Sequence, residues 1–420
     1  MALLWLVCCV SEPETEALEV PIPVEEAAPE AARDLRLDPP KNAILIVIDT
    51  LRADALAEAR TPHIDALGEQ RAVRAWSGGT WTVPSVVSLF TGAPVRSHGF
   101  DLPTGKLGRY PRLPDLPVLA EVLAAEGFRT DGLYSNGYLA EELGFDRGFD
   151  RWRRVTDKVL AKEFHETVAK QWTEDGRHFA YLHFLGPHSP LKPSEETRAH
   201  YEVDAALVEG RMGLEIGAAK RNEPGARLAY QKAYRAVIED TDARIAQVVE
   251  ALGEHRDDTL IVLTSDHGEL LGEHDVVGHG YWVWEPLTNV PFLVSGARTE
   301  VPDFVSNVGT AQLICDELAV AHSFDVDLSD RPVVSQREGK LALSVDGRHK
   351  AIWDGTPRGV EGFFDLEVDP GELTVLADSH GLTQVRDAWQ TTTPAGPVLE
   401  EQVELSEETT EQLEKLGYLE

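Results

Sequence analysis

The chain has 420 residues, of which 42% are hydrophobic and 26% charged, and its formal net charge is −33. This length accommodates one large α/β domain with an appendage, or two domains. The negative charge argues against nucleic-acid binding and against electrostatic adhesion to anionic lipid. An anionic substrate would need local positive charge, which a metal ion can supply. The chain's cysteines are Cys8, Cys9 and Cys315, and they suggest neither a disulfide framework nor a zinc cluster.

The N-terminal residues 1–10, MALLWLVCCV, form an apolar run that is too short to span a bilayer as a helix. The run lacks the positive start of a secretory signal, but its LVCC end resembles a bacterial lipoprotein cleavage site. Residues 11–40, rich in Glu, Pro and Ala, are predicted to be a disordered acidic tether. This order suggests a lipid-anchored protein of the cell envelope or periplasm. The alternative is a truncated or mis-started N-terminus, with a cytoplasmic location.

After the tether, short apolar runs alternate with helical patterns. The expected strands are residues 43–48, 130–134, 179–185, 260–264 and 291–294, and the expected helices are residues 118–127 and 228–252. This alternation predicts an α/β fold with a mainly parallel sheet sandwiched by helices. Residues 341–345 and 349–353 indicate a small antiparallel sheet. We therefore expect a catalytic domain at residues 41–340 and a C-terminal subdomain at residues 341–420.

Two of these strands end in acidic residues. The stretch KNAILIVIDTLRAD, residues 41–54, reaches Asp49, and the stretch IVLTSDHGELLGEHDVVGHG, residues 261–280, reaches Asp266 and His267. Parallel α/β sheets hold their sites at the carboxyl ends of the strands. One Asp-His pair alone could be a solvated polar loop, but the repeated design predicts a metal site built from distant parts of the chain.

The segment GGTWTVPSVVSLFTG, residues 78–92, places small and hydroxyl residues around Pro84, ahead of a helical stretch at residues 85–90. A turn at a helix N-terminus presents N–H groups to an anion. A hydroxyl at this turn could contact the metal and attack phosphorus or sulfur. The alternative is a plain capping turn, and Ser85 is the residue expected to cap the helix.

Several segments, taken in order, resemble the sulfatase family of the alkaline phosphatase superfamily. The resemblance covers residues 41–420 and rests on these stretches: IDTLRAD (48–54), TPHIDAL (61–67), TVPSVVSLFTG (82–92), FAYLHFLGPHSPLKP (179–193), SDHGELLGEHDVVGHGYWVWE (265–285), FFDLEVDPGE (363–372) and LEKLGYLE (413–420). The implied fold is alkaline-phosphatase-like, which agrees with the sandwiched sheet expected from the apolar pattern.

The resemblance also implies roles for individual residues. Asp49, Asp266, His267 and the Thr82 hydroxyl would bind one divalent ion, which could be Mn, Ca, Zn or Mg. Thr82 would be the nucleophile. The remaining two positions, His188 and His279, would contact the anionic group of the substrate or protonate its leaving group. Carboxylates and imidazole suit such a cation, whereas for His188 a purely structural role beside Pro187 is the alternative.

The sequence departs from the family pattern at four places. Most sulfatases have Cys or Ser at the nucleophile, converted to formylglycine, but here the residue is Thr82, whose methyl group prevents that conversion. Val86 stands in place of an Arg, residues 134–136 (Tyr-Ser-Asn) in place of a Lys, and Gly186 in place of an Asp. A direct Thr nucleophile resembles the phosphate- and phosphonate-handling relatives, such as phosphoglycerol and phosphoethanolamine transferases.

We therefore expect a metal-dependent hydrolase that uses Thr82 on a sulfate, phosphate or phosphonate ester. The expected substrate is a small anionic ester, namely a sulfated or phosphorylated glycan, a lipid or an aryl ester. Two alternatives stay open. A phosphoryl transferase of the cell envelope would differ only in the final acceptor, and an inactive sulfatase-like binding protein would explain the loss of two cations.

Overall fold

The computed structural model describes residues 37–101, 109–210, 213–215, 223–354, 361–397, 399 and 402–415. The architecture below is that of the unit Leu35–Glu420. The expected lipoprotein-type signal at residues 1–10, and the expected tether up to residue 36, lie outside the described residues. Within the described ranges, none of the helices has the length and apolar character that crossing a membrane would demand.

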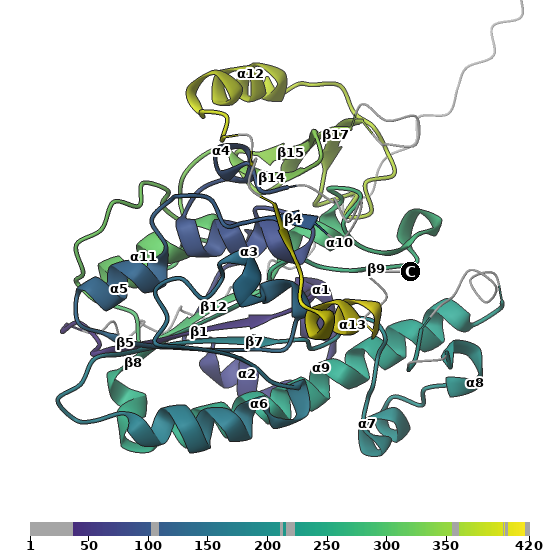
Figure 1. Ribbon diagram of the computed structural model, residues 1–420. Coiled ribbons are helices and arrows are strands. Elements are labelled where there is room, and N and C mark those ends of the chain that lie inside the picture. Colours follow the sequence, from purple (N-terminus) through teal and green to yellow (C-terminus); the bar gives the residue numbers. More distant parts are fainter. Residues whose placement is uncertain are drawn as a thin grey trace, which may run out of the picture. The chain divides into compact units, whose positions relative to one another are not determined.

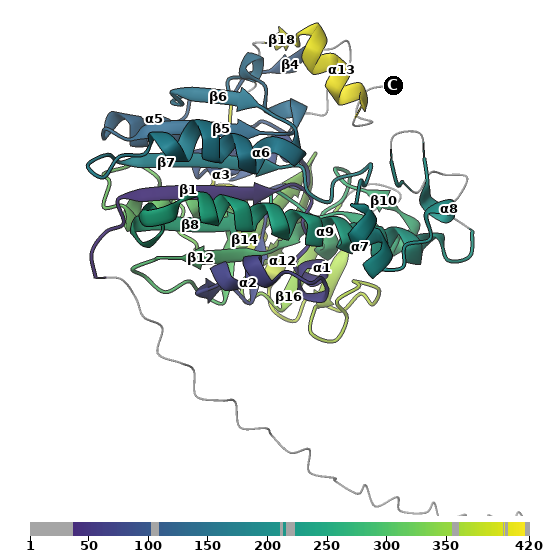
Figure 2. The same cartoon turned by 90° about the horizontal axis from the view of Figure 1, so that it is seen from below.

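A seven-stranded sheet forms the centre of the fold, in the order β2-β12-β8-β1-β7-β5-β6 (Figures 1 and 2). Five neighbouring strands, from β8 to β6 in this order, run parallel, and β12 and β2 complete the sheet in antiparallel pairings. The strands span Asn42–Ile48 (β1), Gln70–Arg71 (β2), Arg129–Tyr134 (β5), Arg151–Arg154 (β6), His178–Phe184 (β7), Thr259–Thr264 (β8) and Phe292–Ser295 (β12). The mainly parallel sheet expected from the sequence is confirmed.

Helices cover both faces of this sheet, because alternate residues of its buried strands point to opposite sides. In β1, Ala43, Leu45 and Val47 join one apolar cluster, and the isoleucines between them join another. The first cluster includes α3 (Thr82–Thr91), α5 (Leu119–Ala125) and α11 (Thr310–Glu317). The second includes α1 (Ala53–Glu58), α2 (Pro62–Leu67), α6 (Asp157–Glu163) and α9 (Ala226–Ala251). Figure 1 shows these two layers above and below the sheet.

Helix α3 begins earlier than the sequence pattern suggested. Its first residue is Thr82 and its N-cap is Trp81, so Ser85 lies within the helix. The expectation that Ser85 caps this helix is therefore wrong, and its hydroxyl is buried without a hydrogen-bond partner. Pro84 explains the shift, because a proline in the first turn of a helix gives up no helical hydrogen bond and has a suitable φ angle. The helix can thus start ahead of the proline.

A four-stranded antiparallel sheet follows in the C-terminal part, with the order β14-β15-β16-β17. Its strands are Val333–Arg337 (β14), Lys340–Ser344 (β15), His349–Trp353 (β16) and Gly362–Asp365 (β17). The small antiparallel sheet is thus present, and β14 lies ahead of the expected boundary at residue 341. Helix α12 (Leu382–Thr392) packs on this sheet through Leu382, Val385 and Trp389.

Shorter elements connect these layers. β3 (Arg74–Trp76) lies between β11 (Asn289–Val290) and β13 (Phe304–Ser306), and β9 (Leu270–Leu271) pairs with β10 (Val277–Gly278). The short helices are α4 (Val95–His98), η1 (Gly137–Leu139), η2 (Glu141–Leu143), α7 (Glu195–His200), α8 (Ala205–Val208) and α10 (Glu285–Thr288). Near the C-terminus, β18 (Gln402–Glu404) pairs with β4 (Arg109–Pro111), and α13 (Glu407–Lys415) buries Leu413 in the core of the first cluster.

Candidate metal centre and active site

The polar residues of the site gather at the carboxyl ends of four adjacent strands. Asp49 follows β1, Asp266 follows β8, Asn136 follows β5, and His183 lies near the end of β7. These strands are hydrogen-bonded neighbours in parallel register. Residues that directly follow them therefore converge at one edge of the sheet, where parallel α/β proteins hold their sites. All four side chains are buried.

Three atoms at this edge are suited to hold a cation. Asp49 Oδ1, Asp266 Oδ2 and His267 Nε2 are buried and have no hydrogen-bond partner. His267 Nε2 lies 3.7 Å from Asp49 Oδ1 and 3.4 Å from Asp266 Oδ2. Buried polar atoms are nearly always satisfied, so three partnerless ligand-type atoms at this spacing fit a divalent metal ion with oxygen and nitrogen ligands.

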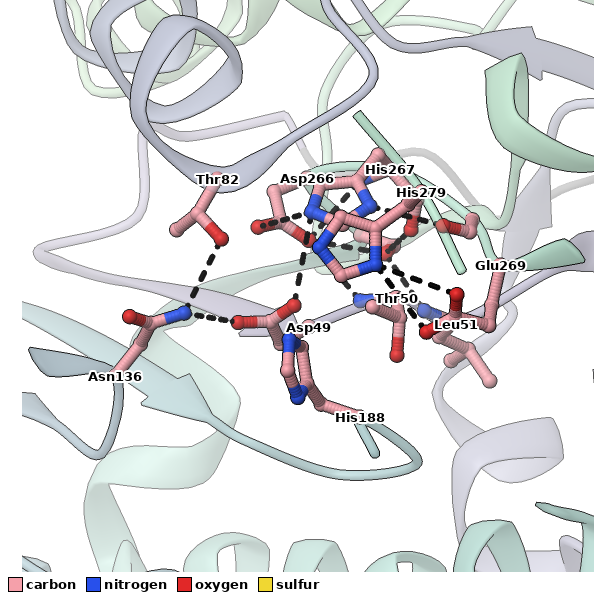
Figure 3. A network of polar contacts seen from close by, with 12 residues as sticks. Asp49, Thr50, Leu51, Thr82, Asn136, His188, Asp266, His267, Glu269 and His279 are labelled. Atoms are coloured by element: carbon pink, nitrogen blue, oxygen red, sulfur yellow. Dashed lines mark hydrogen bonds and ion pairs between the residues drawn. The ribbon is translucent and has the colours of Figure 1, made fainter. Parts of the chain in front are cut away.

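The other polar atoms of these three side chains fix their orientation (Figure 3). Asp49 Oδ2 accepts a hydrogen bond from Asn136 Nδ2 at 2.6 Å. Asp266 Oδ1 accepts from two backbone N–H groups, at 2.9 and 3.2 Å. His267 Nδ1 lies 2.9 Å from the carbonyl oxygen of Gly268, so this nitrogen carries the proton and Nε2 keeps its lone pair. Such outer contacts aim ligand atoms at a metal.

Burial shapes the charge state of this cluster in the metal-free protein. Burial and then the nearby Asp49 carboxylate raise the pKa of Asp266 to about 7, and burial also raises the pKa of Asp49. Burial lowers the pKa of His267 well below its usual range, so its ring is neutral. Two carboxylates and a neutral imidazole lack positive charge, and a cation would supply it.

His183 also approaches the two carboxylates. Asp49, His183 and Asp266 offer ligand atoms that all lie within 4.8 Å of one another. However, both ring nitrogens of His183 have protein partners, since Nδ1 lies 2.7 Å from the Tyr181 hydroxyl and Nε2 lies 3.3 Å from Asp49 Oδ2. We therefore favour His267 as the nitrogen ligand and assign His183 to orienting Asp49. Sequence reasoning missed His183, although a histidine inside an otherwise apolar strand was a usable signal.

Thr82 lies next to this cluster through one shared donor. Asn136 Nδ2 donates to Thr82 Oγ1 at 3.1 Å and to Asp49 Oδ2 at 2.6 Å. The amide of Asn136 is held in this orientation because its Oδ1 accepts from Tyr138 N at 2.9 Å. Thr82 is the first residue of α3, and its N-cap Trp81 provides no side-chain cap. The positive end of the helix dipole therefore faces the same region.

From the sequence, residues 134–136 were noted only because they stand where the family pattern has a lysine. The structure adds that Asn136 bridges Thr82 and Asp49, a contact that sequence reasoning missed. Its position just beyond a parallel strand was the available signal. Val86, the other departure, is fully buried among apolar side chains of the first cluster, so that position offers no charge to a substrate.

Two further histidines lie beside His267. The His279 ring is 4.4 Å from the His267 ring and 5.1 Å from the His188 ring, between centroids. His279 Nδ1 lies 3.2 Å from a Glu269 carboxylate oxygen. Burial by itself lowers the pKa of His279, but Glu269 outweighs it and the pKa is raised. Burial lowers the pKa of His188 to about 4, so near neutral pH His188 is the uncharged member of the pair.

The structure thus brings together every residue that the sequence singled out for the site, namely Asp49, Thr82, His188, Asp266, His267 and His279 (Figure 3). The arrangement combines a candidate cation site, a hydroxyl at a helix N-terminus and two histidines of different charge preference. These are the parts that a hydroxyl nucleophile needs for attack on an anionic ester.

Comparison with known proteins agrees with this architecture. The family model described as Sulfatase matches residues 41–313, well over half of the chain, and the chain therefore belongs to the sulfatase family. It is 24% identical to an ulvan-active sulfatase of Formosa agariphila over 60% of this chain and 55% of the relative. It is 27% identical to an arylsulfatase of Clostridium perfringens over 59% of this chain and 58% of the relative. The matches thus span somewhat more than half the length of these relatives.

Solved structures show the same fold. A phosphonate monoester hydrolase of Agrobacterium radiobacter superposes with a TM-score of 0.62 at 19% identity, over 84% of this chain and 91% of that one. A protein solved with its substrate D-glucosamine-2-N,6-O-disulfate superposes with a TM-score of 0.65 at 12% identity, over 90% of this chain and 98% of that one. At these identities the likeness concerns the fold alone.

Proposed function

We propose that this protein is a metal-dependent hydrolase of sulfate, phosphate or phosphonate esters that uses Thr82 as its nucleophile. One observation carries the proposal. The partnerless atoms Asp49 Oδ1, Asp266 Oδ2 and His267 Nε2 converge in a buried site, and the Asn136 amide joins that site to the Thr82 hydroxyl. A cation site and a nucleophile tied together in this way suit displacement at phosphorus or sulfur.

When bound, a divalent cation supplies positive charge to anionic oxygens and lowers the pKa of a hydroxyl that it contacts. The protein's own groups account for the other steps. Asn136 Nδ2 orients Thr82 Oγ1 and supports negative charge on it as the hydroxyl gives its proton to solvent water. Thr82 Oγ1 then bonds to phosphorus or sulfur as the leaving oxygen departs, and water later cleaves this threonyl ester.

The two histidines suit different proton-transfer roles in this scheme. His279, whose pKa Glu269 raises, is suited to donate a proton to the leaving oxygen. His188, with a pKa near 4, is suited to bind the substrate as a neutral group. General acid catalysis requires a protonated donor within reach of the leaving group, and the histidine beside Glu269 is the better candidate of the two.

The missing cations bear on the substrate. Val86 and Ser135 stand where the family pattern has Arg and Lys, and Val86 is buried in the apolar core. A transition state with concentrated negative charge would lose stabilisation at both positions. We therefore expect phosphodiesters or phosphonate monoesters to be cleaved faster than sulfate monoesters. The names of the curated relatives, an ulvan-active sulfatase and an arylsulfatase, suggest glycan and aryl esters as the first compounds to test.

A sulfatase-like binding protein without turnover is the second candidate, favoured by the loss of these same two cations. A panel assay separates the candidates. Aryl sulfate, aryl phosphate, aryl phosphodiester and aryl phosphonate are each offered with Mn, Ca, Zn or Mg. Activity against at least one ester supports the hydrolase, whereas inactivity throughout supports the binding protein. Highest activity on the sulfate monoester would contradict the expected substrate order.

Substitutions in the active parent then test the nucleophile. Thr82→Ala should lower kcat by at least about 1,000-fold, as loss of a catalytic nucleophile does in other enzymes. Thr82→Ser keeps the hydroxyl and should retain part of the activity. Ser85→Ala is the matched control, because this second hydroxyl of α3 is buried without a hydrogen-bond partner. Loss of activity in Ser85→Ala but not in Thr82→Ala would overturn the assignment.

A further inference from the structure

Arg337 ends the first strand of the C-terminal sheet, β14, and its side chain is only 4% exposed. Its Nε donates a hydrogen bond to the backbone carbonyl of Gly280. Its Nη1 donates to the carbonyl oxygen of Asp101 at 2.9 Å and to the carboxylate of the same residue at 3.0 Å. Arg337 is thus a buried side chain of the C-terminal sheet that bonds to the residue directly after His279.

The same guanidinium contacts the residue directly before Thr82. The central carbon of the Arg337 guanidinium lies 5.3 Å from the ring centroid of Trp81. The indole Nε1 of Trp81 is 3.4 Å from the Asp101 carboxylate that Arg337 also binds. Trp81 in turn packs edge-on against Tyr138, with centroids 5.6 Å apart. Arg337, Asp101 and Trp81 therefore form one connected group that includes the residue directly before Thr82.

The backbone of β14 reinforces this link. Gln336 N donates to the carbonyl oxygen of Gly78 at 2.9 Å, and Gly79 and Gln336 form a β-bridge. Gly78 and Gly79 lead into the turn before Thr82. The C-terminal sheet is therefore hydrogen-bonded through adjacent residues to both segments that carry proposed reacting groups, the turn before α3 and the loop that carries His279.

We propose that Arg337 is a positioning residue that fixes Thr82 and His279 relative to each other and so makes catalysis depend on the C-terminal sheet. The catalytic part of this inference rests on the proposed function. The guanidinium suits this task because its planar fork donates in several directions while its face lies over an aromatic ring. Its charge is already matched by Asp101 and by Glu338, 3.5 Å away, so we assign it no contact with substrate.

Arg348, in the turn between β15 and β16, provides a matched control. Its guanidinium pairs with Asp365 at 2.6 Å and with Glu367, and 47% of its side chain is exposed. No contact in the described structure joins it to Trp81 or Gly280. Arg348→Met therefore removes an arginine and its ion pairs from a turn of the C-terminal subdomain while leaving the group formed by Arg337, Asp101 and Trp81 intact.

Hydrogen–deuterium exchange of the full chain tests positioning without relying on activity. In Arg337→Met, backbone amides of residues 79–83 and 278–282 should exchange faster than in the parent, with the central strands unchanged. Arg337→Lys keeps the positive charge but loses the planar guanidinium. It should therefore fold at least as well as Arg337→Met and still show faster exchange than the parent at the same sites. Unchanged exchange in both variants, or equal acceleration in Arg348→Met, would overturn the proposal.

Kinetics on the best ester of the panel test the consequence for catalysis. Misplaced reacting groups lower kcat more than they raise KM, and a loss of about 10- to 100-fold in kcat is expected for Arg337→Met. Parent-like kcat despite faster exchange would also overturn the proposal. If the parent cleaves no ester, the proposed function fails, while the exchange experiment still decides whether Arg337 positions these two segments.

Discussion

The two ring nitrogens of His267 have different surroundings, and this distinguishes His267 from His183, the other histidine close to the two carboxylates. Nδ1 is occupied by a backbone carbonyl, whereas Nε2 faces two carboxylates without a hydrogen-bond partner. Both nitrogens of His183 are occupied. A residue that binds a cation directly and one that only orients a ligand should therefore differ in how much their removal weakens binding.

We expect His267→Ala to weaken Mn²⁺ binding by more than 100-fold and His183→Ala by roughly 10-fold, in line with the usual effect of an outer-shell partner. Calorimetric titration of the metal-free protein measures both. His178→Ala is the control, because this histidine begins β7, at the opposite end of the strand from His183, and its Nε2 accepts from Thr173 N. A larger loss in His183→Ala than in His267→Ala would place His183 among the ligands instead.

The Asn136 amide is the second residue whose role can be isolated. It makes two hydrogen bonds from one nitrogen, to Thr82 and to Asp49. Asn136→Ala should lower kcat by about 100-fold, the usual cost of losing one donor to a developing negative charge. Steady-state kinetics measure the effect. The neighbouring Ser135→Ala is the control, since that hydroxyl has no hydrogen-bond partner, and an equal loss there would remove the case for Asn136.

The contrast between these residues shows which parts of the site a sequence can reveal. Asp49 and Asp266 were predictable because each comes within two residues of the end of an apolar strand. Asn136 and His183 each offered a local signal, but the residues that they contact could not be predicted, because those contacts depend on which strands are neighbours. Only the order β8-β1-β7-β5 places both of them beside Asp49, and a local pattern does not state that order.

Among the secondary-structure elements, the central strands β1, β5, β7, β8 and β12 were predicted closely, whereas β2, β6 and the start of α3 were not. The apolar runs of β1 and β8 are long and continuous, which leaves little ambiguity. At α3, the small and hydroxyl residues around Pro84 fit a turn as well as a helix. Strand β14 was also missed, although it pairs with β15 across a turn of only two residues, Glu338 and Gly339.

Strand β16 contributes Lys350 to a buried group of charges that joins the C-terminal sheet to α10. Lys350 Nζ lies 2.7 Å from Glu372 and 3.2 Å from Glu285, the first residue of α10. It also lies 4.8 Å from the ring centroid of Trp76. Removing one partner from such a group leaves buried charge without compensation.

Lys350→Met should therefore lower the free energy of unfolding by about 3 to 5 kcal/mol. Urea denaturation measures this change. Arg348→Met, in the turn before the same strand, removes the partly exposed ion pairs with Asp365 and Glu367 and should cost less than about 1 kcal/mol. Equal effects of the two substitutions would show that burial of the Lys350 group contributes little.

For the protein as a unit, the buried carboxylates predict an unusual pH dependence of metal-free stability. The pKa of Asp266 is about 7 in the folded chain, against an ordinary value of 3.8. Between these pH values the folded chain holds a proton that the unfolded chain has lost. The free energy of unfolding should therefore fall as the pH rises from 3.8 to about 7.

A bound divalent cation takes the place of this proton and should remove most of the fall. Urea denaturation across that pH range, with a chelator and with added Mn²⁺, measures the difference. Asp266→Asn with the chelator corrects for all other titrating groups and should show a flatter profile than the parent. Identical profiles for this variant and the parent would mean that Asp266 does not carry the effect.

The acidic segment at residues 11–40 offers few apolar side chains to a core. A chain that begins at Asp38 should keep the parent's melting temperature and its activity in the panel assay. Calorimetry and the same kinetics measure both. Loss of a cooperative transition in the shortened chain would show that the segment packs on the domain. The location in the cell envelope rests on residues 1–10 followed by this acidic segment, and it stays a proposal.

The candidate centre also has a consequence for the order of events in folding. The backbone N–H of Thr50, just after β1, donates a hydrogen bond to Asp266 across 216 positions of the chain. The strands that precede these residues, β1 and β8, lie side by side. The binding atoms meet only after residue 267 has been synthesised and β8 has paired with β1. Metal binding should therefore follow the pairing of these strands. It should stabilise the folded state without taking part in the folding transition state. Depleting the metal should then speed unfolding and leave the folding rate nearly unchanged.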